Sequence, residues 1–424
     1  MNHITESKIE NKREIERKKL FGDTFDYLEK IYEPNLRTFL NKCYQCSRCS
    51  GVCQSSKVQK FTPSRIIQMI LEGFEDKVLK SGVLWDCLTC NQCLKDCPEK
   101  INFADIVRIS RFKMRHLFDQ NVEDYVAHKG IYTTIAEIMS RPYITPNRNL
   151  DWIPDNIKIS QHGDLMYFVG CLPYFEYEFE NPCSIATSTL KLLDRVANEP
   201  IVVLREENCC GHDIYWGQGK LKTFIKLAMK NVEMFEKAGV STIITACVEC
   251  YRTLKIDYPN LFEDFNDKFE VKHLIEYIYD KWKSGIIEFV KPKKIIKEKL
   301  QFTYHDPCRS SRFLPEEINL TGKVREIFKE LERLGYKFQE MEHNKENSLC
   351  CGVSSWMNCN EKTKALRYKR LLEAKKTGNL MVSSCPKCIV HLSCLRDDYK
   401  EQFPIQILDF SEFIINNVKI IHPK

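Results

Sequence analysis

The chain has no apolar run long enough to cross a membrane. A membrane helix needs about 18 or more consecutive apolar residues, whereas the richest stretch here, Thr242-Ile-Ile-Thr-Ala, has only the length of a strand. The chain begins MNHITESKIENKREIERKKL, without the apolar core of a secretion signal. These absences predict a cytoplasmic protein that contacts a membrane only through a partner.

A phosphate-binding loop and a strong excess of charge are also missing. No glycine-rich loop, Walker motif or dinucleotide fingerprint is visible, so we expect no flavin or nicotinamide in this chain. Lys and Arg number 64 against 58 Asp and Glu, a net charge of +6, which is too small a surplus to indicate nucleic-acid binding. Any electrons that the protein uses must therefore come from a partner.

Cysteine, in contrast, is abundant, with 21 residues in a chain of 424. Disulfides would explain this in a secreted protein, but the length, the start of the chain and the cysteine spacing favour metal ligands in a reducing compartment. Eighteen of the cysteines fall into four groups. The first two groups are Cys43-Tyr-Gln-Cys46-Ser-Arg-Cys49-Ser-Gly-Val-Cys53 and Cys87-Leu-Thr-Cys90-Asn-Gln-Cys93-Leu-Lys-Asp-Cys97-Pro98.

These two groups have the spacing of a two-cluster ferredoxin, in which four thiolates hold each cubane 4Fe-4S cluster and the fourth ligand comes from the other run. Zinc is the alternative, but zinc uses two Cys-x2-Cys pairs per ion, and here the third and fourth cysteines match the ferredoxin. Pro98 fits the bacterial pattern, whereas Gln54 replaces the other proline, which we expect to loosen a turn without removing a ligand. The expected sets are Cys43, Cys46, Cys49 and Cys97 for one cubane, and Cys87, Cys90, Cys93 and Cys53 for the other.

A five-cysteine pattern occurs twice in the rest of the chain. Five ligands are one more than a cubane needs, and a turn at Gly211 could aim both adjacent sulfurs into one pocket. The alternative is a cubane plus one structural cysteine in each repeat. Cys183, Cys359 and Cys394 match no set and are expected to be ordinary buried thiols. The two sets are Cys171, Cys209, Cys210, Cys247 and Cys250, and then Cys308, Cys350, Cys351, Cys385 and Cys388.

The length predicts two or three domains, and the pattern along the chain predicts an α+β multidomain fold. A helical, two-cluster ferredoxin-like domain is followed by two duplicated α/β (Rossmann-like) halves. The charged N-terminal helix could dock a partner or be merely solvated. The expected ranges are 1–34 for this helix, 35–125 for the ferredoxin-like domain, 126–160 for a linker, and 161–290 and 298–420 for the two halves.

The duplication rests on a repeated order of strands and cysteines. Cysteines follow the predicted strands, and open α/β sheets place their sites at the carboxyl ends of strands. The predicted strands are Leu165–Val169, Ile201–Leu204 and Ser241–Thr245 in the first half, and Gln301–Tyr304, Lys337–Met341 and Leu380–Ser383 in the second.

The motifs around these cysteines resemble a known family. One half of the cysteine-rich CCG domain is similar to Phe168-Val-Gly-Cys171, Asn208-Cys-Cys-Gly-His212 and Cys247-Val-Glu-Cys250-Tyr251. The other half is similar to His305-Asp-Pro-Cys308-Arg309, Cys350-Cys-Gly-Val-Ser-Ser-Trp356 and Cys385-Pro-Lys-Cys388. Residues 43–108 resemble the small ferredoxin-like subunit of heterodisulfide reductase. Fused in this order, residues 40 to about 415 look like the catalytic D-type subunit of that enzyme.

The resemblance implies a cofactor and a reaction. In that family each five-cysteine set holds a non-cubane 4Fe-4S cluster, and the disulfide of coenzyme M and coenzyme B (CoM-S-S-CoB) is cleaved between the two clusters in single-electron steps. It therefore implies two non-cubane clusters here, with the two cubanes as relays. It also implies a disulfide substrate and a hetero-oligomer whose electron-donor subunit is a flavoprotein or a membrane cytochrome b.

A second function is compatible with the same cysteines. Related CCG proteins are electron-carrying subunits of anaerobic glycerol-3-phosphate, glycolate and lactate dehydrogenases, or belong to sulfur-metabolism and benzoyl-CoA reductase complexes. The alternative is therefore a non-catalytic electron-transfer subunit. An open, cationic pocket between the two five-cysteine sets would favour the enzyme, and a closed apolar wall would favour the relay.

Three polar residues beside the ligand cysteines are candidates for catalysis. His212 could donate a proton to a departing thiolate, or could instead make a structural hydrogen bond near the cluster. Arg309 and Lys387 could hold an anionic group of the substrate, or could only offset the charge of the clusters. Trp216 and Trp356 follow the double cysteines and are expected to shield the clusters from water.

Overall fold

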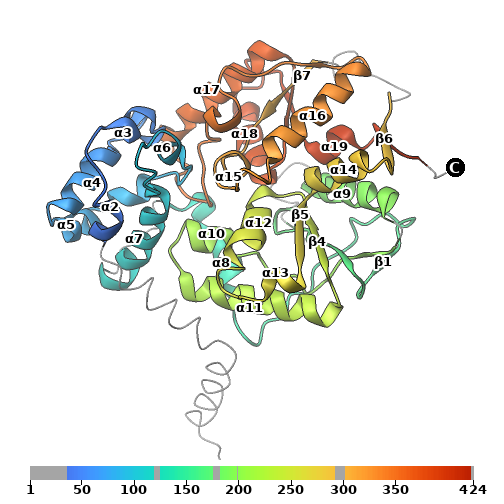
Figure 1. The fold of residues 1–424 in the computed structure, drawn as a ribbon, viewed down its shortest axis with the longest axis horizontal. Coiled ribbons are helices and arrows are strands. Elements are labelled where there is room, and N and C mark those ends of the chain that lie inside the picture. The colour runs from blue at the N-terminus through green and yellow to red at the C-terminus, as the bar shows by residue number, and fades with distance from the viewer. Residues whose placement is uncertain (1–35, 119–124, 175–181, 198, 292–300, 422–424) are drawn as a thin grey trace, which may run out of the picture.

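The structure is a computed structural model that describes residues 36–118, 125–174, 182–197, 199–291 and 301–421. The charged helix expected over residues 1–34 lies outside these ranges. Figure 1 shows a helical N-terminal part, in blue, beside two α/β parts, one green to yellow and one orange to red. The expected α+β multidomain fold, a helical domain followed by two α/β halves, is confirmed.

The N-terminal part is helical because its apolar residues recur at helical spacing. Helix α4 (Pro63–Leu71) begins with a proline, which suits the first turn, and buries Ile66, Ile67 and Ile70. It ends just before Gly73, whose φ is 93°. The other helices of this part are α2 (Leu36–Leu40), α3 (Arg48–Val52), α5 (Glu75–Lys80), α6 (Gln92–Lys95) and α7 (Phe103–Phe118).

Residues 126–160, expected as a linker, contain a packed helix. Helix α8 (Ile131–Met139) buries Tyr132 and Ala136. The Tyr132 ring stacks on Trp356 of the second half, with the ring centroids 4.2 Å apart. The prolines at positions 142 and 146 gave this segment the composition of a linker, although the apolar residues before them have helical spacing.

The first α/β half contains a parallel sheet of five strands in the order β1-β3-β2-β4-β5. Met166 of β2 lies opposite Ile243 of β4, and the order of the strands reverses between these two neighbours. Such a switch point is where open sheets bind ligands, and Cys171 and Cys247 follow these strands. The strands are β1 (Ile159–Ser160), β2 (Leu165–Tyr167), β3 (Ile201–Val202), β4 (Thr242–Thr245) and β5 (Glu270–His273).

The second half repeats this topology in a parallel sheet with the order β10-β9-β7-β8. Its central neighbours, β7 and β9, lead to Cys308 and Cys385, as β2 and β4 lead to the first set. The same order of strands in both sheets agrees with the internal duplication. The strands are β7 (Gln301–His305), β8 (Lys337–Phe338), β9 (Leu380–Ser383) and β10 (Gln406–Asp409).

Helices cover both sheets, and strands β1, β5 and β10 of these sheets were not foreseen. In strand β5 the charged residues Glu270 and Lys272 alternate with buried ones, so the strand has no continuous apolar run that would reveal it in the sequence. Strand β10 also begins with a polar residue. The helices of the first half are α9 (Pro182–Val196), α10 (His212–Trp216), α11 (Leu221–Ala238), α12 (Val248–Arg252), α13 (Phe265–Lys268) and α14 (Leu274–Lys283). Those of the second are α15 (Cys308–Ser311), α16 (Leu320–Arg333), α17 (Glu361–Thr377), α18 (Pro386–Asp398) and α19 (Phe410–Ile414).

Strands and helices outside the cysteine sets also join the two halves. Strand β6 (Ile287–Phe289) of the first half pairs antiparallel with β11 (Val418–Ile420) from the end of the described chain. Helix α14 packs on α16, and α9 packs on α19. Among the described residues, none of the helices has the length and apolar character that a membrane crossing requires.

Candidate iron–sulfur cluster sites

Both ferredoxin-like cysteine loops have the same backbone shape. Gln45 and Thr89 occupy matching positions and have φ angles of 60° and 43°. Ser47 and Asn91, two residues further on, have φ angles of 62° and 61°. Non-glycine residues rarely adopt this left-handed region, so its repetition shows that each loop curls its three cysteines around a common centre.

The fourth cysteine of the first run lies beside the second run. Burial raises the pKa of the Cys87 thiol to about 12 and that of Cys49 to about 11, so these thiolates need a bound cation to form at neutral pH. The thiols of Cys53, Cys87, Cys90 and Cys93 line one small cavity. Four soft sulfur donors around one cavity fit a 4Fe-4S cluster.

Both double-cysteine turns require glycine. Gly211 has a φ of 86°, and a side chain there would begin 2.6 Å from the Phe224 ring. Gly352 has a φ of 79°, and a side chain there would begin 2.7 Å from the Thr363 carbonyl oxygen. Only glycine tolerates both the left-handed backbone and the close contact, which agrees with the turn expected at Gly211.

Each five-cysteine set is gathered at the carboxyl edge of its own sheet. In the first half, Cys209 interacts with Cys171. In the second half, the Cys351 and Cys388 sulfurs are 3.4 Å apart. The thiols that line one cavity of the first half are those of Cys171, Cys210, Cys247 and Cys250. This donor chemistry fits iron–sulfur clusters, while the assignment of each ligand stays a prediction.

The four sets are neighbours of one another in a definite order. Cys93 of the second ferredoxin-like loop has Cys49 of the first as an electrostatic neighbour. Cys90 of the second loop is a neighbour of Cys308, in the second α/β half. The Cys385 thiol of that half then interacts with Cys247 of the first half. In this series the second five-cysteine set stands between the ferredoxin-like sets and the first five-cysteine set, an order that the sequence did not predict. The first half also contacts the ferredoxin-like part, because Arg111 Nη1 donates to the Trp216 carbonyl at 2.9 Å.

Gln54 occupies the position where the ferredoxin pattern has proline, and it makes a contact between domains. It is 2% exposed, its side-chain oxygen accepts from the Cys350 amide at 2.6 Å, and its side-chain nitrogen donates to the Ser348 carbonyl at 3.4 Å. A loosened turn was expected here, whereas the side chain ties a ferredoxin-like cysteine run to a double-cysteine turn.

Replacing Gln54 by alanine is expected to lower the free energy of unfolding by about 1–3 kcal/mol, because the Cys350 amide would be left buried without a partner. Denaturant unfolding of the anaerobic protein measures this. Gln68→Ala is the matched control, since its side chain bonds only Arg65 and Glu72 in exposed contacts. A loss no larger than that of the control would show that Gln54 does not stabilise the docking.

His212 lies at the meeting point of both halves and is 1% exposed. Arg309 Nε donates to its Nε2 at 3.1 Å, so Nδ1 carries the proton and donates to Thr253 Oγ1 at 3.0 Å. Burial, together with the cations Arg309, Lys387 and Arg252, lowers the pKa of His212 well below its usual value. With both nitrogens engaged, the geometry favours the structural interpretation of His212 over proton donation.

Arg309 joins all three parts of the protein. Its Nη1 and Nη2 donate to the Thr89 carbonyl and hydroxyl oxygens at 2.9 and 3.1 Å. Its guanidinium lies 4.7 Å from the centre of the Trp216 ring and 4.3 Å from that of Phe313. A side chain that is 1% exposed and held in this way fits charge balance and docking better than the binding of a substrate anion.

Lys387 of the second half reaches between two carboxylates of the first. Its ammonium contacts Asp213 and Glu249, and all three residues are buried. Burial alone would lower the pKa of Lys387, but these carboxylates hold it well above its usual value. The described residues between the two five-cysteine sets thus form a paired charge network, which is neither the open cationic pocket nor the apolar wall considered above.

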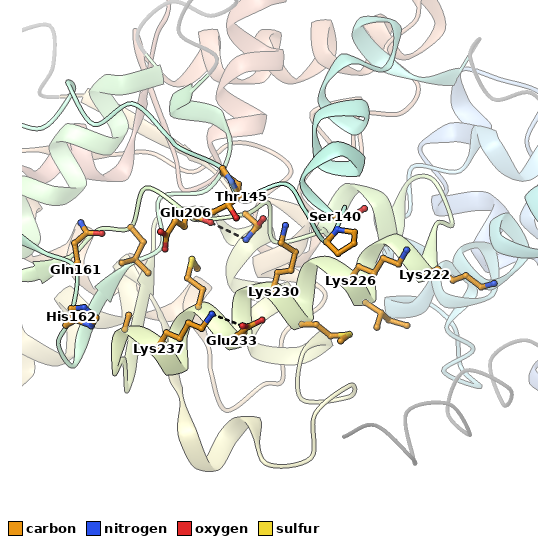
Figure 2. Close-up of a pocket in the computed structure, with 18 residues that line it drawn as sticks. Ser140, Thr145, Gln161, His162, Glu206, Lys222, Lys226, Lys230, Glu233 and Lys237 are labelled. Carbon is orange, nitrogen blue, oxygen red and sulfur yellow. Dashed lines mark hydrogen bonds and ion pairs between the residues drawn. The ribbon is translucent and has the colours of Figure 1, made fainter. Parts of the chain in front are cut away.

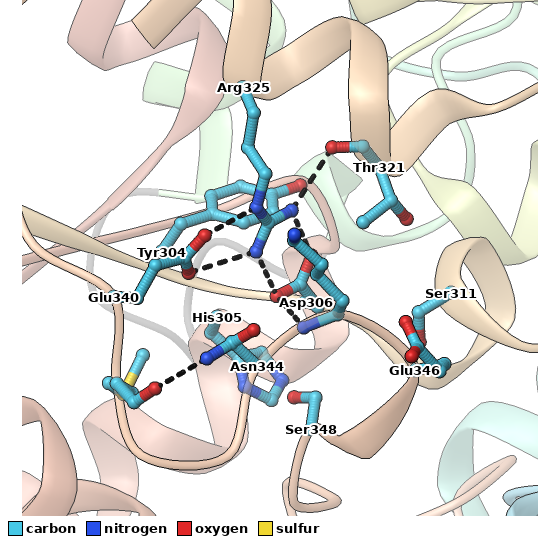
Figure 3. Close-up of polar contacts among 12 residues, drawn as sticks. Tyr304, His305, Asp306, Ser311, Thr321, Arg325, Glu340, Asn344, Glu346 and Ser348 are labelled. Carbon is cyan, nitrogen blue, oxygen red and sulfur yellow. Dashed lines mark hydrogen bonds and ion pairs between the residues drawn. The ribbon is translucent and has the colours of Figure 1, made fainter. Parts of the chain in front are cut away.

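Arg325 fixes the loop that carries Cys308, as Figure 3 shows. Its Nη1 and Nη2 each donate to an Asp306 oxygen at 2.8 Å, and its Nε and Nη2 donate to Glu340 at 2.6 and 3.0 Å. The remaining donor reaches the Thr321 carbonyl at 3.0 Å. Sequence reasoning missed Arg325; the acidic residue just before Pro307-Cys308 was the signal that a buried cation must lie nearby.

A broad cavity lies away from the cysteines, along α11. Figure 2 shows Lys222, Lys226 and Lys230 in a row on that helix. Lys230 donates to the carbonyls of Met139 at 2.6 Å and Arg141 at 3.1 Å, so it holds the end of α8 in place. No cysteine lines this groove, and it is not the chemical centre of the molecule.

The cysteines outside the four sets differ from expectation where they are described. Cys359 and Cys394 are exposed rather than buried, because Cys394 lies on the outer face of α18 and Cys359 lies in the loop before α17. The side chain of Cys183 lies outside the described residues. Trp216 and Trp356 are each 1% exposed, beside the turns that they were expected to cover.

Comparisons with known proteins agree with this arrangement. The cysteine-rich domain family, CCG, matches residues 165–255 and 302–393, and the 4Fe-4S dicluster domain family matches residues 39–101. The chain therefore belongs to the CCG-domain iron–sulfur proteins that include the D-type subunit of heterodisulfide reductase.

Individual relatives show how far the similarity extends. The D-type subunit of the dihydromethanophenazine:CoB–CoM heterodisulfide reductase of Methanosarcina barkeri is 28% identical over 87% of this chain and 83% of its own length. The EtfAB:quinone oxidoreductase of Syntrophomonas wolfei is 24% identical over 74% of this chain but only 44% of its own length. A crystal structure of a hypothetical protein from Helicobacter pylori has the same fold with a TM-score of 0.50, at 9% identity, over 92% of this chain and 74% of that one.

Proposed function

We propose that this iron–sulfur oxidoreductase is the disulfide-reducing subunit of a reductase complex. Two cubane 4Fe-4S clusters would be held by the ferredoxin-like cysteines in the sets expected above, and two non-cubane 4Fe-4S clusters by the five-cysteine sets. The substrate is a disulfide of the CoM-S-S-CoB type. It takes up two electrons and two protons, its S–S bond breaks, and two thiols leave.

The observation that carries this proposal is the series of neighbouring thiols across three domains. The series begins at the surface, where Cys46 is exposed, and passes through Cys90 and Cys308 to the contact between Cys385 and Cys247. When bound, iron–sulfur clusters supply single-electron transfer. A partner subunit that docks near Cys46 is the proposed electron donor, which makes the working form a hetero-oligomer.

The surrounding side chains have defined tasks in this proposal. Arg309 and Lys387 offset the negative charge of the thiolates and keep the two halves together, and Arg325 keeps Cys308 in place through Asp306. His212 holds the Arg309 guanidinium by accepting a hydrogen bond from its Nε–H. None of these residues needs to move or to change its protonation for the relay.

The iron content of the protein tests the cofactor assignment directly. Four clusters of four irons predict about sixteen iron atoms per chain in anaerobically prepared protein. Iron, sulfide and zinc analysis measures this. A complement near eight irons, with zinc in the remaining sites, would reject the assignment at the five-cysteine sets.

Disulfide reduction with reduced methyl viologen as donor tests the reaction itself. Thiol release from CoM-S-S-CoB is expected at two thiols per disulfide, and added thiol is expected to change the paramagnetic signal of a five-cysteine site. Cys350→Ser should abolish both effects, whereas Cys394→Ser, at an exposed cysteine outside the sets, should keep both.

An electron-transfer subunit without its own substrate is the second candidate. It is favoured by the pairing of Lys387 with Asp213 and Glu249, which leaves that ammonium committed, and by the likeness to EtfAB:quinone oxidoreductase. If the clusters are intact and their paramagnetic signals do not change on addition of anionic or neutral disulfides or thiols, this second function would be established over the first.

A further inference from the structure

Two buried histidines of the second half each have one ring nitrogen without a partner. His305 and His391 are each 1% exposed, and the Nε2 atoms of both have no hydrogen-bond partner among the described residues. A buried polar atom left unpaired costs about 1–3 kcal/mol, and buried polar groups in native proteins are nearly always paired. These two nitrogens therefore indicate a ligand beside them.

The orientation of His305 is fixed from its other side. Arg370, which is 0% exposed, donates from Nε to His305 Nδ1 at 2.9 Å. Arg370 is itself held by Glu373 at 2.9 Å and by Ser348 at 3.2 Å. Since Nδ1 accepts a hydrogen bond, the proton of the neutral ring sits on Nε2. The unpartnered atom of His305 is thus a hydrogen-bond donor.

His391 stands on α18 beside one cysteine of the second set and close to another. It follows Cys388 by three residues, which makes the two neighbours on the helix surface, and Cys385 is the residue that precedes the first turn of the helix. The Trp356 ring packs edge-on against His391, with the ring centroids 5.0 Å apart, and limits how the imidazole can turn.

One cysteine links both imidazoles to the second set. The Cys351 sulfur lies 3.4 Å from that of Cys388, and Cys351 interacts electrostatically with both His305 and His391. Both imidazoles therefore lie near the thiols of the second half, and the same half adjoins the ferredoxin-like part where Cys90 is an electrostatic neighbour of Cys308.

The first half has no histidine at the matching positions. Phe168 stands three residues before Cys171, as His305 stands before Cys308, and Thr253 stands three residues after Cys250, as His391 stands after Cys388. The Thr253 hydroxyl accepts a hydrogen bond from His212 Nδ1 at 3.0 Å. The two repeats thus share their cysteines and differ in the groups that can donate to sulfur.

We propose that His305 and His391 donate N–H hydrogen bonds to sulfur of the cluster held by the second half, and so raise its reduction potential above that of the first half. The proposal rests on the cluster assignment in the proposed function. Hydrogen bonds to sulfur stabilise the added negative charge of a reduced cluster. The first electron to arrive would rest in the second half, and a second electron would be needed before both halves are reduced.

Redox titration of the loaded protein, followed by EPR, tests this. In His391→Leu, which removes the donor, the ratio of reduced to oxidised second-half cluster at a fixed potential is expected to fall about tenfold, equivalent to about 59 mV for one electron. His391→Gln keeps an N–H donor and should restore most of that ratio. His305→Phe, the residue of the first half, should act like His391→Leu, and His162→Gln, at an exposed histidine, should change nothing.

A second readout reports the contact itself. Pulsed EPR of protein labelled with ¹⁵N-histidine is expected to show coupling of the second-half cluster to nitrogen, reduced in His391→Leu and in His305→Phe. An unchanged ratio, an equal change in both halves, or coupling that survives both substitutions would overturn the proposal. If His391→Leu loses iron, the test is instead the ratio of reduced to oxidised second-half cluster in His391→Gln, compared with the wild type. Absence of any five-cysteine cluster signal in the wild type would instead reject the proposed function.

Discussion

Replacing Lys387 by methionine is expected to lower the free energy of unfolding by about 3–5 kcal/mol, the usual cost of removing one partner from a buried ion pair. The Asp213 and Glu249 carboxylates would remain buried without their cation. Methionine keeps most of the apolar stem that packs in this place, so the loss reports the charge. Denaturant unfolding at equal iron content is the measurement.

A control and a rescue separate charge from packing. Lys419→Met removes an exposed ammonium 3.9 Å from Glu288 and should cost less than about 1 kcal/mol. Adding Asp213→Asn and Glu249→Gln to Lys387→Met removes the orphaned charges and should recover most of the stability. If the triple variant is no more stable than Lys387→Met, or if Lys387→Met resembles Lys419→Met, this account of the charge network is wrong.

Spacing within the sequence predicted the cysteine loops and turns, because their backbone geometry is encoded locally, while the assignment of each ligand stays a prediction. The left-handed residues Thr89 and Asn91 belong to loops whose cysteine spacing was already informative, and the glycine after each double cysteine marked a tight turn. The strands that lead to the sets were also visible, since buried parallel strands consist of continuous apolar runs.

Contacts between distant parts of the chain could not be predicted in the same way. Gln54 contacts the Cys350 loop across almost 300 residues of sequence, and nothing in its local pattern distinguishes a docking residue from a lost proline. Lys387 and Arg309 were recognised as cations near ligands, but their carboxylate, imidazole and carbonyl partners come from other domains. A charged residue that sequence reasoning assigns to a substrate can therefore be fully paired in the fold.

The order of the sets is the most consequential feature that the sequence left open. Either half could have faced the ferredoxin-like part, because both carry the same five cysteines. The contacts of Cys90 with Cys308 and Cys350, together with Gln54 and Arg309, place the second half next to it. Because of that order, replacing Cys90 tests the path that electrons take.

Cys90→Ser is expected to stop turnover driven by a protein donor while leaving turnover driven by a small dye. A hydroxyl is a poor ligand for soft iron, so the cluster of Cys53, Cys87, Cys90 and Cys93 should be lost, with about four irons. With reduced ferredoxin as donor, the rate of disulfide reduction should fall by at least about 100-fold, the upper end of what changes outside the ligand shell cause. Reduced methyl viologen is small enough to reach the α/β halves directly and should keep most of its rate.

The comparison of donors, rather than either rate alone, tests the relay. Cys394→Ser changes an exposed cysteine outside every set and should keep its iron and both activities, which controls for the loss of a thiol. An equal fall with ferredoxin and with viologen, while the signals of the five-cysteine sites stay intact, would mean that the Cys90 set does more than pass electrons on. Full activity with ferredoxin in a Cys90→Ser protein that has lost its four irons would mean that electrons reach the second half by another route, and that the contact between Cys90 and Cys308 is structural.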